Sequence, residues 1–158
     1  MLNIKRWWQS LGFGIQSKTD FAFLKDVIKE QHPYYAYEYL RQQFPNASQQ
    51  QTHQAQLIFR IINHLRPSDV VTLGTPSKLI LAHINAASKG EGKPLIYIEG
   101  EAKLPHSHGY SAIIINNINN TNANAWKQVL CTNAVTYDAK TIGIAIFYPN
   151  RTPEHYKI

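Results

Sequence analysis

Residues 70–83, VVTLGTPSKLILAH, join an apolar run to a short turn and a second apolar segment at helical spacing. This order predicts a buried strand, a tight turn and a helix, and α/β proteins hold nucleotide-like ligands at such turns. Gly74 is the residue that would let a ligand approach the backbone closely. Turns that bind dinucleotides carry two or three glycines, whereas this turn carries one. The residues alone therefore leave open a working cofactor loop and the remnant of one.

The polar residues of the turn suggest a second chemistry, the binding of a small anion. Thr75 is expected to cap the helix, which would then run over residues 76–87 with a proline in its first position. A phosphate or carboxylate at the helix N-terminus would lie beside Thr75, Ser77 and Lys78. The alternative is a lysine that simply extends into water.

The histidine and cysteine pattern predicts no metal and no catalytic residue. His106 and His108 form an H-x-H pair, which could belong to a zinc site or to a solvated loop. Because no third ligand is identifiable, the solvated loop is favoured. Cys131 is the only cysteine, which excludes an intramolecular disulfide and suits a reducing compartment. The sequence contains no Ser-His-Asp set, Walker loop or nucleophile elbow.

Composition predicts one soluble domain over residues 1–158. Hydrophobic residues make up 44% of the chain and charged residues 16%, as in an ordinary globule. The net charge is +6, but lysines and arginines are scattered with no run of five, so we expect no nucleic-acid partner. Without an apolar stretch of membrane-spanning length or a signal-peptide pattern, we expect a cytoplasmic protein with no membrane partner.

The elements that must position these residues follow from the apolar spacing. Residues 1–66 are expected to be helical, ending with a helix over residues 54–65, and residues 67–158 to form the core. Strands are expected at 70–73, 94–99 and 112–115, with a helix over 122–130. Two further runs, 135–137 and 142–148, are expected to pair antiparallel. The order predicts an α/β fold with a mostly parallel sheet.

Several segments resemble the bacterial class I S-adenosylmethionine-dependent methyltransferases. They are GFGIQSKTDFAFLKDVIKEQHPYYAYEYL, QAQLIFRIINHLRPSDVVTLGT, IYIEG, AIIINNINNTNANAWKQVL and VTYDAKTIGIAIFYPNRTPEHYKI. These are similar to the family's N-terminal segment, first helix and strand, second strand, a later strand with its helix, and the closing antiparallel hairpin. The resemblance implies a Rossmann-like fold in which Gly74 approaches the cofactor and Glu99 holds its ribose.

The family's first motif is an acidic residue followed by glycines at alternate positions. In this sequence it falls on Thr72, Gly74, Pro76 and Lys78, and one of the four keeps the family residue type. Thr72 replaces the acid, Pro76 offers no N–H, and Lys78 places a long side chain where close approach is needed. Gly74 alone is retained. These changes indicate a degenerate motif.

Two further departures lie later in the chain. Only about ten residues separate Glu99 from the next apolar strand, too few for the family's middle strands and helices. Asn116 and Asn117 stand where the family has acidic residues, and a neutral carboxamide cannot act as a general base. The chain therefore resembles a shortened member of the family.

Together these features predict a reduced Rossmann-like methyltransferase fold with a non-catalytic role, that of a pseudoenzyme that binds or scaffolds. Its expected partner is a second copy of the chain or another protein, and no cofactor is expected, S-adenosylmethionine being the one candidate. The first alternative is a methyltransferase that binds S-adenosylmethionine through Gly74 and Glu99 with a partner chain. The second is a small-anion-binding module at the helix near Pro76.

Overall fold

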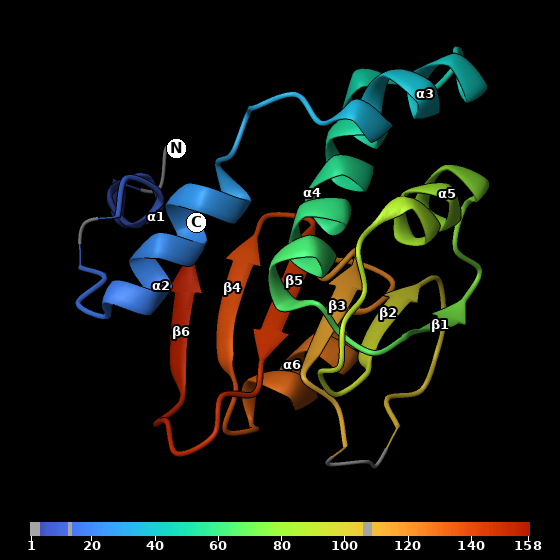
Figure 1. The fold of residues 1–158 in the computed structure, drawn as a ribbon. Helices are drawn as coiled ribbons and strands as arrows, with labels where there is room; N and C mark the ends of the chain where they lie inside the picture. The colour runs from blue at the N-terminus through green and yellow to red at the C-terminus, as the bar shows by residue number, and fades with distance from the viewer. Residues whose placement is uncertain (1–3, 13, 106–108) are drawn as a thin grey trace.

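The computed structural model describes residues 4–12, 14–105 and 109–158 (Figure 1). Helical segments occupy most of the first 65 residues, as the spacing predicted, and strands and helices follow. The helices are α1 (Ile4–Ser10), α2 (Lys18–Phe23), η1 (Leu24–Ile28), a π-helical continuation of α2, α3 (Tyr35–Gln43), α4 (Gln49–Leu65), α5 (Lys78–Ala86) and α6 (Ala123–Leu130). The strands are β1 (Val70–Gly74), β2 (Leu95–Glu99), β3 (Ala112–Asn116), β4 (Val135–Ala139), β5 (Ile142–Ile146) and β6 (Glu154–Lys157).

The strands form one mixed sheet in the order β1-β2-β3-β5-β4-β6. The pairs β1–β2, β2–β3 and β4–β6 are parallel, and β5 runs antiparallel to both β3 and β4. The α/β class, the mostly parallel sheet and the antiparallel β4–β5 pair are thereby confirmed. Strand β6 was not predicted, because three of its four residues are exposed and its sequence EHYK carries no apolar alternation.

Helix α5 begins later than the turn residues predicted. Its N-cap is Ser77, whose hydroxyl accepts a hydrogen bond from the N–H of Ile80, and its first residue is Lys78. The expected cap, Thr75, instead donates its N–H to the carbonyl of Glu99 at 2.7 Å. This bond keeps Thr75 at the end of the sheet, so the prediction of a cap at Thr75 and a helix from Pro76 was wrong.

Both faces of the central strands are apolar, and helices cover them. The side chains of Tyr97 and Ile114 lie in a core with α4, α5 and η1, whereas those of Ile98 and Ile115 lie in a second core with α6. In Figure 1, α4 and α5 lie on one side of the sheet and α6 on the other. The alternation along each strand thus produces two apolar layers.

A buried ion pair attaches the N-terminal helices to the end of the chain. Asp20, in the first turn of α2, is fully buried and accepts two hydrogen bonds from Arg151, at 2.6 and 2.8 Å. The hydroxyl of Tyr156 on β6 donates a third, at 2.9 Å. Burial acts to raise the pKa of Asp20, but the hydrogen bonds from Arg151 and Tyr156 and the charge of Arg151 outweigh it and lower that pKa.

We expect Asp20→Asn to lower the free energy of unfolding by about 3 kcal/mol at neutral pH, because Arg151 loses its partner in a buried pair. The lowered pKa means that this stabilisation is present above the usual Asp value of 3.8 and is lost as the pH falls through the lower folded value. Urea unfolding of both proteins between pH 7 and pH 2 measures the difference, which should shrink in acid. Asp26→Asn, at an exposed carboxylate of η1, is the control and should change little at any pH.

Gly143 on β5 lies directly beneath the indole of Trp126. A Cβ atom at this position would lie 2.5 Å from the ring, closer than carbon atoms approach without displacement. The glycine is therefore needed for α6 to pack on the sheet.

We expect Gly143→Ala to destabilise the fold by about 2 kcal/mol through overpacking. In a Trp126→Leu background the same change should cost less, because the smaller side chain leaves room for the methyl group. Chemical denaturation of the four proteins gives the coupling energy. Equal costs in the two backgrounds would show that the strain does not arise from this contact.

Candidate functional site

The residues that the methyltransferase resemblance selected lie close together at the carboxyl ends of three neighbouring strands. Gly74 ends β1, Glu99 ends β2 and Asn116 ends β3. Because these strands are parallel, their ends meet at one edge of the sheet. The structure therefore brings Gly74 and Glu99 together, and the register pairs them directly.

The carboxylate of Glu99 is hydrogen-bonded within the protein through both oxygens. Its Oε2 accepts the N–H of Ser77 at 3.2 Å and the hydroxyl of Tyr97 at 3.1 Å. Its Oε1 accepts the side-chain amide of Asn116 at 3.3 Å. Burial, together with the charge of Glu99, raises the pKa of the Tyr97 hydroxyl well above its usual value, which keeps Tyr97 a donor. The acid that the resemblance assigned to a ribose thus binds three groups of its own chain.

The β1–α5 turn packs directly on the end of β2. Gly74 has φ +83°, and a Cβ atom there would lie 2.1 Å from the carbonyl oxygen of Glu99. A Cβ atom on Gly100 would lie 2.6 Å from Oγ1 of Thr75. The glycine that could admit a ligand to the backbone is used here for the close approach of another strand end.

The start of α5, the expected anion site, also has a carboxylate beside it. The bond from the N–H of Ser77 to Glu99 places a negative charge at this helix N-terminus, where the macrodipole favours one. Ser77 and Thr75 both make hydrogen bonds within the protein, whereas Lys78 is exposed. Of the three predicted anion ligands, Thr75 and Ser77 bind within the protein, and the side chain of Lys78 is exposed.

The other predicted residues include the two asparagines at the end of β3. Asn117 adopts φ 56°, and its backbone N–H donates to the side-chain oxygen of Asn116, a bond that shapes the turn after β3. His106 and His108 lie outside the described residues. Within the described part of the chain, no group of three or more His, Cys, Asp or Glu side chains could hold a metal ion. Cys131 is exposed and is a free thiol.

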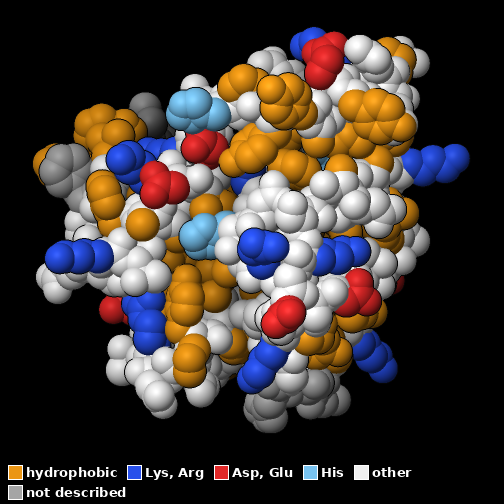
Figure 2. All heavy atoms as spheres, in the orientation of Figure 1, with side chains coloured by type: hydrophobic (Ala, Val, Ile, Leu, Met, Phe, Trp, Pro, Cys, Tyr) orange, Lys and Arg blue, Asp and Glu red, His pale blue; other side chains and the backbone are white. Residues whose placement is uncertain are grey.

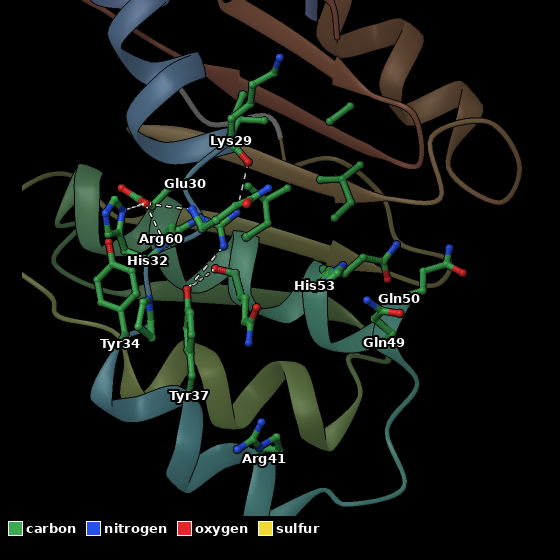
Figure 3. Close-up of a pocket in the computed structure, with 18 of the residues that line it drawn as sticks. Lys29, Glu30, His32, Tyr34, Tyr37, Arg41, Gln49, Gln50, His53 and Arg60 are labelled. Atoms are coloured by element: carbon green, nitrogen blue, oxygen red, sulfur yellow. Dashed lines mark hydrogen bonds and ion pairs between the residues drawn. The ribbon is translucent and has the colours of Figure 1, made fainter.

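A cleft of about 1100 Å³, which the sequence analysis did not predict, is lined by neither Gly74 nor Glu99. We call it the α3–α4 cleft, since those helices line it together with residues 28–34 and the β4–β5 turn (Figure 3). Nε2 of Gln54 on α4 donates to the hydroxyl of Thr141 at 3.1 Å, which joins α4 to that turn. The cleft brings together residues far apart in the chain, and no short motif marks it.

Arg60 lies at the centre of the α3–α4 cleft (Figure 3). Its guanidinium donates to the carbonyl oxygens of Val27 at 2.7 Å and Ile28 at 3.2 Å, and to the hydroxyl of Tyr37 at 3.5 Å. Tyr37 in turn donates to the carbonyl of Gln56. Burial raises the pKa of the Tyr37 hydroxyl, although the neighbouring Arg60 opposes the shift. These bonds fix the end of η1 against α4.

Aromatic and charged side chains complete the cleft wall. The rings of Tyr34 and Tyr37 lie 5.2 Å apart, and each packs on Phe59. Glu30 accepts hydrogen bonds from the backbone N–H and side chain of His32, which lower the pKa of Glu30. The arrangement offers flat rings beside a fixed cation, which suits binding more than acid–base chemistry.

No protein-family model, curated protein or solved structure matches this chain. A helix with the length and apolar character needed to span a bilayer is absent from the described residues.

We expect Arg60→Gln to lower the free energy of unfolding by about 2 kcal/mol, because the carbonyls of Val27 and Ile28 lose charged donors. Arg41→Gln is the matched control from the same cleft, since Arg41 pairs with Glu38 on an exposed helix surface. Its loss should cost less than about 0.5 kcal/mol. Thermal and urea unfolding measure both, and equal effects would contradict an anchoring role for Arg60.

Proposed function

We propose that this protein is a non-catalytic, methyltransferase-like binding protein whose former cofactor site is closed by its own side chains. The observation that carries the proposal is the hydrogen bonding of Glu99 to Ser77, Tyr97 and Asn116. A ribose would have to displace these donors, which lie in contact with the acid that it needs. The substitutions at the first motif, where Thr72 and Pro76 replace an acid and a glycine of the family, support the same conclusion.

The strand order differs from that of a complete Rossmann-like fold. In a doubly wound Rossmann sheet the first strand is central, with strands on both sides, and the cofactor binds beside it at the switch in strand order. Here β1 has one neighbour among the described strands, β2, and stands at the edge of the sheet. Among the described strands β1 therefore has no second neighbour that could form the wall enclosing a nucleotide beside it.

A partner protein fits a chain that has kept this fold without its chemistry. The amides Asn116 and Asn117 occupy the positions where the family places acids, and neither can accept a proton as a general base. A second copy of the chain or another protein is the proposed partner.

Calorimetric titration with S-adenosylmethionine and S-adenosylhomocysteine tests the proposal. We expect no binding of either ligand, because Glu99 and the backbone beside Gly74 already bind within the chain. A functional methyltransferase run in the same buffers controls for ligand quality.

Binding with a Kd below about 100 μM, or about −5.5 kcal/mol, that is lost in Glu99→Ala would contradict the proposal. It would support instead a S-adenosylmethionine-dependent methyltransferase that works with a partner chain. Binding of inorganic phosphate that is lost in Lys78→Ala would support the anion-binding alternative.

A further inference from the structure

We propose that the α3–α4 cleft binds an acidic segment of a partner protein, with Arg60 as the anchor for one of its carboxylates. The inference rests on the proposed binding role, to which it adds a surface and a chemical class of partner. It depends on the described residues of the cleft, which include neither Gly74 nor Glu99.

The guanidinium of Arg60 is held in place by hydrogen bonds and forms no ion pair with an acidic residue that the structure describes. A guanidinium has five N–H donors, and here three atoms, Nε, Nη1 and Nη2, bind neutral oxygens. None of the ion pairs formed by the described residues includes Arg60. Those three bonds fix the plane of the guanidinium, and they leave one further N–H on each Nη atom of this cleft-lining residue. A carboxylate is the group that such a fork binds best.

The two acidic side chains of the cleft are already engaged. Glu30 accepts from His32 and from the N–H of Gln31. Glu38 pairs with Arg41 and also accepts from Gln42. Neither carboxylate neutralises Arg60, so the cleft retains positive charge.

Two lysines add to this charge. Lys29, at the end of η1, and Lys140, in the β4–β5 turn, line the cleft, and both are exposed. Neither forms an ion pair with another residue that the structure describes. In the view of Figure 3, Arg60 lies between Lys29 and Arg41, and the Lys29 side chain extends away from it. A ligand with several carboxylates would complement these basic side chains of the cleft, in agreement with the chain's net charge of +6.

The size and polarity of the cleft favour a peptide. Its volume of about 1100 Å³ lies near the upper end of the range of roughly 300–1,000 Å³ that small-molecule pockets occupy, which leaves room for a short peptide segment. Amide side chains on the wall can both donate to and accept from a peptide backbone. They belong to Gln49, Gln50, Gln54 and Gln56. The rings of Tyr34 and Tyr37 add the amphipathic contact area that is enriched in protein interfaces.

A nucleic acid fits this surface less well. A phosphate backbone needs a continuous basic track, whereas the Lys and Arg side chains on the face drawn in Figure 2 are scattered among hydrophobic and polar groups. Glu30 and Glu38 would also face the phosphates within the cleft.

Fluorescence anisotropy with a labelled peptide of about ten residues, alternating glutamate and tyrosine, tests the inference on the full chain. We expect saturable binding that weakens with added salt. The same peptide with glutamine in place of glutamate should bind at least about tenfold more weakly, since it lacks the carboxylates.

The decisive variant is the double substitution Lys29→Glu, Lys140→Glu, both at exposed positions where folding should be unaffected. We expect it to weaken binding about tenfold, from two reversed charges at the rim of the cleft. The matched control, Lys103→Glu with Lys127→Glu, makes the same change in net charge at exposed residues outside the cleft and should alter the Kd by less than about twofold. Arg60→Gln, with its fold checked by circular dichroism, should abolish binding.

Three results would overturn the inference: equal binding of the glutamine peptide, equal losses in the two double variants, or tighter binding of a single-stranded oligonucleotide that depends on Lys29 and Lys140. The S-adenosylmethionine titration separates this failure from that of the proposed function. If the protein binds neither the cofactor nor the peptide, only the cleft inference is wrong. If it binds the cofactor and also binds the peptide through Lys29, only the non-catalytic assignment is wrong.

Discussion

The central strands of this protein are apolar on both faces, and this requirement for cover on two sides organises the rest of the chain. Strands β2, β3 and β5 lie between α4 and α5 on one face and α6 on the other. The N-terminal helices then need polar anchors, which Asp20 supplies by pairing with Arg151 and Arg60 supplies by binding the end of η1. The bonds from Arg60 hold the end of η1 against α4, beside the cleft that residues 28–34 and the β4–β5 turn line.

The same carboxyl group can serve a ligand or the fold, and in this chain Glu99 serves the fold. It lies where an α/β protein places a ribose acceptor, yet it joins the β1–α5 turn to β2 and β3 through Ser77 and Asn116. Donors and acceptors around Glu99 need partners, because an unpaired polar group in a protein interior is costly. Mutual pairing of Glu99 and Asn116 meets that requirement without ionic repulsion.

Most of the fold could be predicted from local patterns. The apolar runs at 94–99 and 112–115 gave β2 and β3, and the spacing of 135–148 gave the β4–β5 pair. Strand β6 could not be predicted, since its pairing with β4 depends on a distant strand rather than on its own polar sequence. The start of α5 was misplaced for a similar reason: the bond from Thr75 to Glu99 joins the residue after β1 to the end of β2, and only the folded sheet brings these residues together.

By itself, the sequence determined the alternation of apolar residues, the single glycine at the β1–α5 turn and the neutral amides of Asn116 and Asn117, because these properties belong to individual residues. The tertiary structure decided how those side chains are used. Whether Glu99 is free to bind a ligand depends on contacts with residues up to 22 positions away. The cleft around Arg60 is likewise built from α3, α4 and a turn near residue 140, so its charge and shape arise only when long-range packing brings them together.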